Sequence, residues 1–248
     1  MFCFCKSVIL ANGGSFDDII VLIILLYKSE KSMLFNGGYS PVGHCFATDR
    51  VVGIKVLQED DMQRCSWVNE DKLMIRYHDE EWGVPTYDDR KLFEMLLLEG
   101  MQAGLSWITI LKKRENFRQA LDGFDACKIA HYNDVKVGEL MANPGIIRNH
   151  LKIKAAIENA WKFLAIQEQQ GSFSRFIWQF VAGKPRLNRW ATADEVPATT
   201  KESDAMSKAL RKLGFKFVGS TICYSFMQAT GMVNDHTENC FLFDKSTR

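Results

Sequence analysis

The stretch HLKIKAAIENAWKFLAIQE, residues 150–168, decides the fold class because its apolar residues recur with the period of an α-helix. At positions i, i+3, i+4, i+7 and i+11 stand Ile153, Ala156, Ile157, Ala160 and Leu164. This spacing places them on one helix face, which can pack on a core while the opposite face meets water. We predict a long amphipathic helix here.

The same period continues on both sides of this stretch. It predicts six further helices, over residues 90–103, 106 or 107 to 120, 135–141, 173–181, 200 or 203 to 213, and 219–230. Asp88 and Asp89 can cap the first of these, and Gly104 can end it. A proline-containing stretch, residues 183–200, predicts an irregular loop. Because alternating strand patterns are scarce, we expect an all-α fold.

Composition places the chain among ordinary globular proteins. Of its 248 residues 47% are hydrophobic and 25% charged, with a net charge of +1, which excludes wholesale disorder and collagen-like repeats. Seven scattered cysteines are too few for a disulfide scaffold and favour a reducing compartment, so we expect a cytoplasmic protein. No apolar run reaches the roughly 18 residues that a membrane helix requires.

The first part of the chain, residues 1–61, differs from the rest. Its longest apolar run, Ile19–Leu26, is too short to span a membrane and follows two aspartates, which argues against a signal peptide. We interpret this part as a poorly ordered extension, or as upstream sequence translated from a false start. A buried strand in the apolar run is the alternative. The functional domain is then predicted to cover residues 62–248, and we expect it to be a monomer.

Two pairs of potential metal ligands lie at the ends of this domain. They are Cys65 with His78, and His236 with Cys240. The second pair has the spacing H-x3-C, which would place both side chains on one face of a helical turn. Two cysteines and two histidines form a normal tetrahedral zinc set, and four protein ligands make a closed, structural site that would tie an N-terminal strand to the C-terminus. The alternative is that these are unrelated buried core residues.

A carboxylate falls on an apolar helix face. Glu99 lies seven residues after Leu92 and three after Leu96, on the predicted buried stripe. Such a position costs free energy unless the acid is paired or has a function. The nearby aromatic residues are Trp67, Tyr77, Trp82 and Trp107. Aromatic residues at this density usually form core, but together with a buried acid they would also suit a planar, positively charged ligand.

Residues 142–150, between two predicted helices, are similar to a helix-hairpin-helix, a motif that binds DNA phosphate through backbone N–H groups. Gly145 stands in the hairpin, and Arg148 and Lys152 follow it in a basic run. We therefore name these three residues as candidate DNA contacts. Only one of the two usual glycines is present, so a plain helical hairpin is an equally good interpretation. A near-neutral charge permits nucleic acid binding without requiring it.

Three stretches together resemble the 3-methyladenine DNA glycosylase I family of alkylation-repair enzymes. They are CSWVNEDKLMIRYHDEEWGVP (65–85), KLFEMLLLEGMQAGLSWITILKKRENFR (91–118) and SKALRKLGFKFVGSTICYSFMQATGMVNDH (207–236). The resemblance implies a helix-hairpin-helix DNA glycosylase fold in which a structural zinc joins the domain termini, held by Cys65, His78, His236 and Cys240. One departure is His150-Leu151, where the family hairpin is more basic and contains glycine.

The resemblance also implies a base pocket. At the matching positions Glu99 would hydrogen-bond the base as the catalytic residue, and Tyr77 and Trp107 would pack on or beside it. Met74 stands where another aromatic residue is expected, so this wall would stack less well. The implied substrate is 3-methyladenine in double-stranded alkylated DNA.

The implied reaction is hydrolysis of the N-glycosidic bond, which releases the free base and leaves an abasic site. Residues 135–193 contain no Asp, the residue that related hairpin glycosylases place after the hairpin. Methylation at N3 makes the base cationic, so it can leave as a neutral molecule without a general acid. Because no Lys is placed for Schiff-base chemistry, we expect a monofunctional enzyme.

Three alternatives stay open on the sequence. The first is a zinc-containing DNA-binding module without catalysis, and the second is an enzyme of the same fold that acts on another purine or lesion. The third is a zinc-dependent hydrolase, which would need an open metal position. Identification of the bases released from methylated DNA would separate all three.

Overall fold

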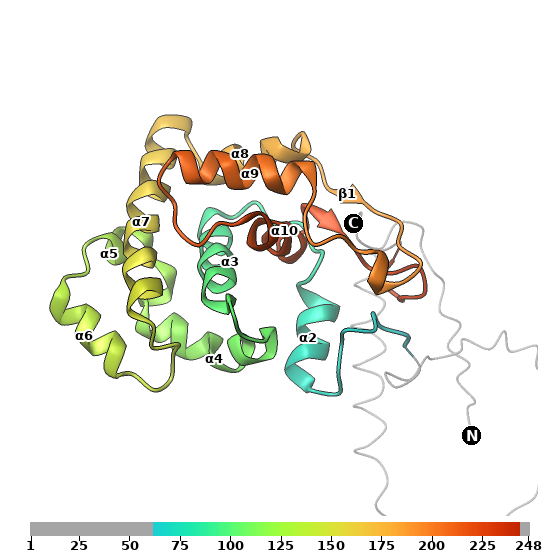
Figure 1. The fold of residues 1–248 in the computed structure, drawn as a ribbon, viewed down its shortest axis with the longest axis horizontal. Coiled ribbons are helices and arrows are strands. Elements are labelled where there is room, and N and C mark those ends of the chain that lie inside the picture. Colours follow the sequence, from blue (N-terminus) through green and yellow to red (C-terminus); the bar gives the residue numbers. More distant parts are fainter. Residues whose placement is uncertain (1–61, 244–248) are drawn as a thin grey trace, which may run out of the picture. The chain divides into compact units, whose positions relative to one another are not determined.

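The structure is a computed structural model that describes residues 62–243. The predicted extension, residues 1–61, lies outside the described residues. The described part is mostly helical, with short 3₁₀ turns and one pair of two-residue strands (Figure 1). The helices are α2 (Lys72–Glu80), α3 (Asp89–Gln102), α4 (Trp107–Ala120), α5 (Ala126–Ala130), α6 (Asp134–Ala142), α7 (His150–Gln170), α8 (Phe173–Trp178), α9 (Lys201–Lys212) and α10 (Ser220–Ala229). The 3₁₀ turns are η2 (Asp122–Phe124), η3 (Gln179–Val181) and η4 (Ala193–Glu195).

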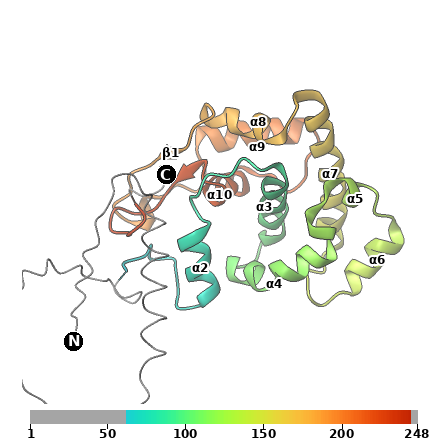
Figure 2. The same ribbon diagram turned by 180° about the vertical axis from the view of Figure 1, so that it is seen from behind.

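Helix α3 is the central helix of the described residues. It contacts α4, α7, α8 and α10, and both views show it between α7 on one side and α10 on the other (Figures 1 and 2). Every residue from Met95 to Met101 is buried, so this part of the helix is enclosed on all faces. A helix that is apolar all round is one that a core surrounds, and this burial explains its central place.

Asp89, in the first turn of α3, fixes the central helix to α8. Its carboxylate accepts hydrogen bonds from the backbone N–H groups of Phe173 at 2.9 Å and Ser174 at 2.6 Å. It also accepts one from the amide of Gln167, on α7, at 2.6 Å. An acid at a helix N-terminus satisfies N–H groups that have no partner within the helix. One predicted cap residue therefore joins three helices.

The predicted helices are confirmed, with most boundaries within two residues. Helix α8 ends at Trp178 and continues as the 3₁₀ turn η3. Two helices were not predicted. In α2 the buried positions are Met74, Tyr77 and His78, so a histidine occupies the place of an apolar residue in the i, i+3, i+4 pattern. Helix α5 has only five residues and is too short to show a period.

The structure corrects one prediction about an extended segment and adds a detail to another. Cys65 does not lie in a strand: its carbonyl accepts a hydrogen bond from the N–H of Val68 at 3.0 Å, which forms a turn. The predicted loop 183–200 is irregular, but it contains β1 (Arg186–Leu187), which pairs in parallel with β2 (Val233–Asn234). The strands β1 and β2 contain only two residues each. That is too few to show the alternation of apolar and polar residues that marks a longer strand.

The loop after α2 packs closely on the turn after α10. Gly83 donates its N–H to the carbonyl of Gln228 at 3.0 Å, and Thr86 donates to that of Thr230 at 3.1 Å. Gly231 has φ +67°, and a Cβ there would lie 2.3 Å from backbone atoms of Val84 and Pro85. Both its conformation and the close approach of another backbone therefore require glycine.

We predict that Gly231→Ala destabilises the protein by more than the roughly 1–2 kcal/mol that a positive φ costs an L-residue, because the new methyl group also collides with backbone. Gly171→Ala is the matched control, since Gly171 has φ +84° and a Cβ there would meet no atom within 4 Å. Urea denaturation of both variants measures the two free energies. Equal losses in the two variants would contradict the close packing of this turn.

Candidate active site and metal centre

A cavity of about 380 Å³ lies where α2, α3, α4 and α10 meet. Residues of the loop 193–198 and of the segment 235–237 complete its wall. The aromatic residues that line it are Trp67, Tyr77, Trp82, Trp107 and Tyr224. Glu99 and Asp235 supply carboxyl groups, and Met74 lies in the wall as well. The tertiary structure thus brings the aromatic residues and the acid on the apolar stripe to one place.

Glu99 is buried, with 4% of its surface exposed. No hydrogen bond or ion pair within residues 62–243 reaches its carboxyl group, although it lines the cavity. Burial alone raises the pKa of this carboxyl group to about 8, because the charged form loses its hydration. An unpaired acid in a cavity is suited to a ligand that brings either a positive charge or hydrogen-bond donors.

Two aromatic side chains flank the same cavity. The ring centroids of Tyr77 and Trp107 lie 5.2 Å apart, with 51° between the ring planes. Burial, followed by the nearby charge of Glu99, raises the pKa of Tyr77 well above its usual range, so this phenol stays neutral. The indole Nε1 of Trp107 is buried and has no partner among the described residues. Rings at such spacing form a surface against which a planar ligand can pack.

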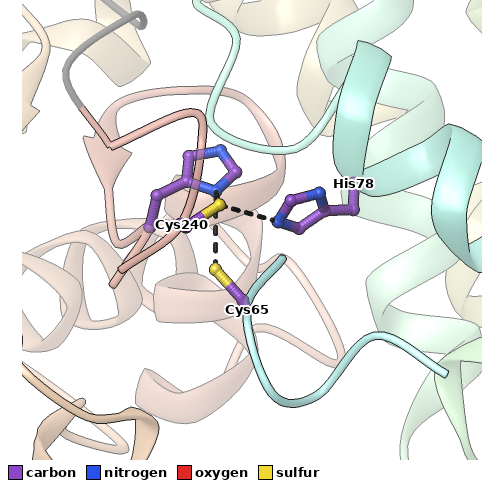
Figure 3. A group of neighbouring side chains, drawn as sticks. Cys65, His78 and Cys240 are labelled. Carbon is purple, nitrogen blue, oxygen red and sulfur yellow. Dashed lines mark hydrogen bonds between the residues drawn. The ribbon is translucent and has the colours of Figure 1, made fainter. Parts of the chain in front are cut away.

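A second group of side chains lies close to the cavity. The ligand atoms of Cys65, His78, His236 and Cys240 all lie within 4.8 Å of one another, and all four residues are buried. Figure 3 shows three of them converging: Cys65 from the turn before α2, His78 from α2, and Cys240 from the C-terminal segment. Segments from the two ends of the domain therefore meet, since Cys65 and His236 are separated by 171 positions.

The spacing of these atoms fits a tetrahedral metal ion. The Sγ of Cys65 lies 3.5 Å from the Nδ1 of His236, and the Sγ of Cys240 lies 3.5 Å from both Nε2 of His78 and Nδ1 of His236. With zinc–sulfur and zinc–nitrogen bonds of about 2.3 and 2.1 Å, a tetrahedron has sulfur–nitrogen edges of about 3.6 Å, close to these distances. Hydrogen bonding from Cys240 and the imidazoles also lowers the pKa of the Cys65 thiol, which favours a thiolate ligand.

The outer hydrogen bonds of the two imidazoles leave the correct nitrogens for a metal. His78 donates from Nδ1 to the carboxylate of Asp79 at 2.7 Å, and Asp79 in turn accepts hydrogen bonds from Arg64. His236 donates from Nε2 to the carbonyl of Trp82 at 3.2 Å. The inward nitrogens can then carry lone pairs toward the cluster. Outer partners of this kind orient metal-binding histidines in proteins.

The predicted helical turn at His236 and Cys240 was wrong. The segment after β2 is irregular: His236 donates its N–H to the side chain of Asn234 at 3.0 Å, and Cys240 donates to the carbonyl of Thr237 at 2.8 Å. This turn folds the chain back, so that both side chains face the same point without a helix. The H-x3-C spacing was informative, but the local conformation behind it is different.

The metal cluster and the cavity share two tryptophans. The ring of Trp82 lies 4.7 Å from that of His236, and the ring of Trp67 lies 5.4 Å from that of His78. Trp67 and Trp82 also contact each other edge to face at 4.9 Å, and both line the cavity. Trp67 and Trp82 therefore lie between the cluster and the cavity and contact both.

The hairpin between α6 and α7 differs from the expectation in two details. The N–H of Gly145 is donated to the side chain of Asn143 at 2.8 Å, so it is already used inside the hairpin. Lys152 is buried, and its ammonium group donates to the carbonyls of Met101 at 2.8 Å and Ala103 at 2.7 Å, at the end of α3. Lys152 therefore points away from the surface, while Arg148 is exposed.

Several residues of the site were not identified from the sequence. Asp235 is buried in the wall and accepts hydrogen bonds from Tyr224 and Gln228 on α10. These two residues are four positions apart on the last helix, so they share a helix face, and this spacing was the available signal. The sequence of residues 193–198 contains no pattern from which their place in the cavity wall could be predicted.

Within residues 62–243, none of the helices combines the length and the apolar character that a membrane span needs.

Comparisons with known proteins point to one family. A family profile described as methyladenine glycosylase matches residues 67–243. The chain is 54% identical over 179 residues to DNA-3-methyladenine glycosylase 1 of Escherichia coli (strain K12), which covers 72% of this chain and 96% of that protein. It is 49% identical over 177 residues to DNA-3-methyladenine glycosylase of Haemophilus influenzae, covering 71% and 96%.

Solved structures agree with these relatives. A crystal structure of 3-methyladenine DNA glycosylase I superposes with a TM-score of 0.70 at 57% identity, covering 72% of this chain and 98% of that one. Another, from Staphylococcus aureus and concerned with 3-methyladenine recognition, has a TM-score of 0.70 at 36% identity, covering 72% and 95%. The profile covers well over half of the chain, and the relatives are matched over nearly their whole length. The chain therefore belongs to the methyladenine glycosylase family.

Proposed function

We propose that this protein hydrolyses the N-glycosidic bond of 3-methyladenine in alkylated DNA, releasing the free base and leaving an abasic site. The observation that carries the proposal is Glu99, a buried carboxyl group with no partner among residues 62–243, in a cavity bordered by Tyr77 and Trp107. The relatives named as 3-methyladenine DNA glycosylases match this chain over nearly their whole length, and one solved relative is in complex with 3-methyladenine.

The charge of the lesion explains the choice of base. In DNA, methylation at N3 leaves the adenine ring positively charged. Glu99 would lose its proton beside this cation, and the carboxylate would accept a hydrogen bond from the exocyclic amine. The rings of Tyr77 and Trp107 would attract the same cation through their electron-rich faces. A normal adenine has no charge, so it gains much less on entering the cavity and does not offset the cost of leaving the duplex.

The bond that breaks joins C1′ of the sugar to N9 of the base. The base takes the electron pair and becomes neutral, the sugar becomes an oxocarbenium ion, and water adds to C1′ and loses a proton. The leaving group needs no proton from the protein. Because the base loses its charge as the bond breaks, attraction to Glu99 weakens along the reaction. The residue predicted as catalytic would therefore contribute more to selection of the lesion than to bond cleavage.

We propose that Cys65, His78, His236 and Cys240 hold a structural zinc ion. Four protein ligands complete a tetrahedral shell, so the ion would supply a rigid link and no reaction step. This arrangement disfavours the alternative of a zinc-dependent hydrolase, which needs an open position. The protein's own residues, Glu99 and the surrounding rings, would contact the substrate.

We propose that the hairpin between α6 and α7 is the helix-hairpin-helix element that contacts double-stranded DNA, with the protein acting as a monomer. The exposed Arg148 is the residue of this hairpin best placed to meet a phosphate. Lys152 is left out of this contact, because its amine is bound to the end of α3.

Glu99→Ala and Trp107→Ala should both reduce the release of 3-methyladenine from methylated DNA. We expect a loss of about 30-fold or more for Glu99→Ala, since it removes a hydrogen bond to a charged group, and several-fold for Trp107→Ala. Chromatography of the released bases measures both. Glu168→Ala, an exposed acid on α7, is the control. Full activity in both site variants would overturn the site assignment, whereas base binding without release would favour a non-catalytic binding module.

The raised pKa of Glu99 predicts a pH-dependent stability. The folded protein keeps a proton on Glu99 that the unfolded chain loses near pH 4.5. The contribution of this group to the stability of the folded state is therefore complete below that pH and is lost as pH rises through about 8. Above this pH range, the shift in the pKa of Glu99 corresponds to a loss of about 3–5 kcal/mol in the free energy of unfolding. Glu99→Gln should therefore unfold at higher urea concentration than the wild type at pH 9 and nearly equally at pH 5. Glu168→Gln should show no such difference, and a pH-independent effect of Glu99→Gln would rule out the mechanism.

Loss of one metal ligand should cost both zinc and stability. We expect Cys240→Ser to be purified with little zinc and to melt on the order of 10 °C lower, because metal binding contributes directly to the free energy of folding. Cys127→Ser is the matched control, since Cys127 is exposed and outside the cluster. Metal analysis and thermal unfolding check the pair; a wild-type zinc content and melting temperature in Cys240→Ser would remove the zinc proposal.

A further inference from the structure

Asp235 is a buried acid that the proposed reaction does not use. Only 1% of its surface is exposed, and its carboxylate accepts four hydrogen bonds. One oxygen accepts from Asn188 Nδ2 at 2.7 Å and Trp190 Nε1 at 2.8 Å. The other accepts from the hydroxyl of Tyr224 at 2.7 Å and Gln228 Nε2 at 2.8 Å. Four donors fill the hydrogen-bonding capacity of a carboxylate, so Asp235 has none left for a substrate.

The four donors come from two different segments, one of which lines the cavity. Tyr224 and Gln228 lie on α10 and line the cavity themselves. Asn188 and Trp190 lie in the loop that follows β1, just before the wall residues 193–198. Asp235 therefore joins the helix on one side of the cavity to the loop that forms another part of its wall.

The wall loop has few other polar attachments among the described residues. The backbone hydrogen bonds that involve residues 192–196 stay within the loop, between Thr192 and Glu195 and between Ala193 and Val196. Two backbone contacts hold the loop just before them: Asn188 donates to Asn234 at 3.1 Å, and Glu238 donates to Trp190 at 2.9 Å. The side-chain bonds to Asp235 thus provide much of the polar attachment next to the wall.

We propose that Asp235 is a positioning residue for the base pocket: it holds the loop 188–198 against α10 and so keeps the pocket wall in place. It touches no base and transfers no proton in this role. The inference rests on the proposed function, because it assigns Asp235 to the wall of the pocket that would receive 3-methyladenine. It also separates Asp235 from its neighbour His236, which faces the metal cluster.

Asp235→Asn tests the role because it keeps the size of the side chain. An amide offers only one acceptor oxygen, so two of the four hydrogen bonds must break or reverse direction, and the negative charge that strengthened all four is lost. We expect free 3-methyladenine to bind about 10-fold more weakly, in line with the loss of hydrogen bonds to a charged group. We also expect KM for methylated DNA to rise more than kcat falls, protease cleavage within residues 183–200 to become faster, and the zinc content to stay at the wild-type value.

Two further variants sharpen the test. Trp190→Phe removes one donor from the loop side only, and we expect it to weaken base binding about threefold in the same direction. This variant decides the question if Asp235→Asn fails to fold. Asp194→Asn is the control, since Asp194 is an exposed acid in the same loop that does not line the cavity. It should match the wild type in base binding, cleavage and metal content.

The outcomes are distinct. Wild-type base affinity in both Asp235→Asn and Trp190→Phe overturns the proposal, as does unchanged protease cleavage of the loop. A loss of zinc that parallels the loss of base binding also overturns it, because Asp235 would then act through His236. If the wild-type protein itself neither binds nor releases 3-methyladenine, the proposed function is wrong, while the cleavage rates still report whether Asp235 holds the loop.

Discussion

A carboxyl group buried without a partner is the constraint on which this site depends. Desolvation of Glu99 costs free energy, and the packing of α3 on four other helices must offset that cost. The central helix is buried throughout from Met95 to Met101, so the surrounding core holds Glu99 in place. The same cost becomes useful when a positively charged ligand enters, because ion pairing replaces the lost hydration.

The cluster of Cys65, His78, His236 and Cys240 lies beside the cavity. Trp67 and Trp82 pack on the histidines of the cluster with one part of their surface and line the cavity with another. Asp235 precedes His236 of the cluster and accepts hydrogen bonds from Tyr224 and Gln228 on α10. Short segments before α2 and after β2 thus contribute Trp67, Asp235 and Thr237 to the cavity wall, although neither is a regular element. Their positions depend on contacts with each other rather than on local conformation.

The proposed chemistry requires little from the protein after the base has been selected. A cationic purine is already a good leaving group, so a site of this kind needs recognition more than acid catalysis. The described residues agree with this division, since Glu99 lacks a partner while Asp235 has all its acceptor positions filled. Glu99 is available to bind a ligand, whereas the carboxylate of Asp235 is used entirely in hydrogen bonds within the protein.

The sequence by itself determined most of the helices and one local anomaly. Apolar spacing predicted most helices within two residues, and Glu99 was identified because an acid on an apolar stripe is costly. Spacing alone left the four metal ligands open, and the resemblance to a known family was needed to join them. Only the tertiary structure decided which distant residues meet: the four donors around Asp235, the inward direction of Lys152, and the turn that carries Cys240. Periodicity reports on neighbours within a few residues, whereas these contacts depend on how segments far apart in the chain cross.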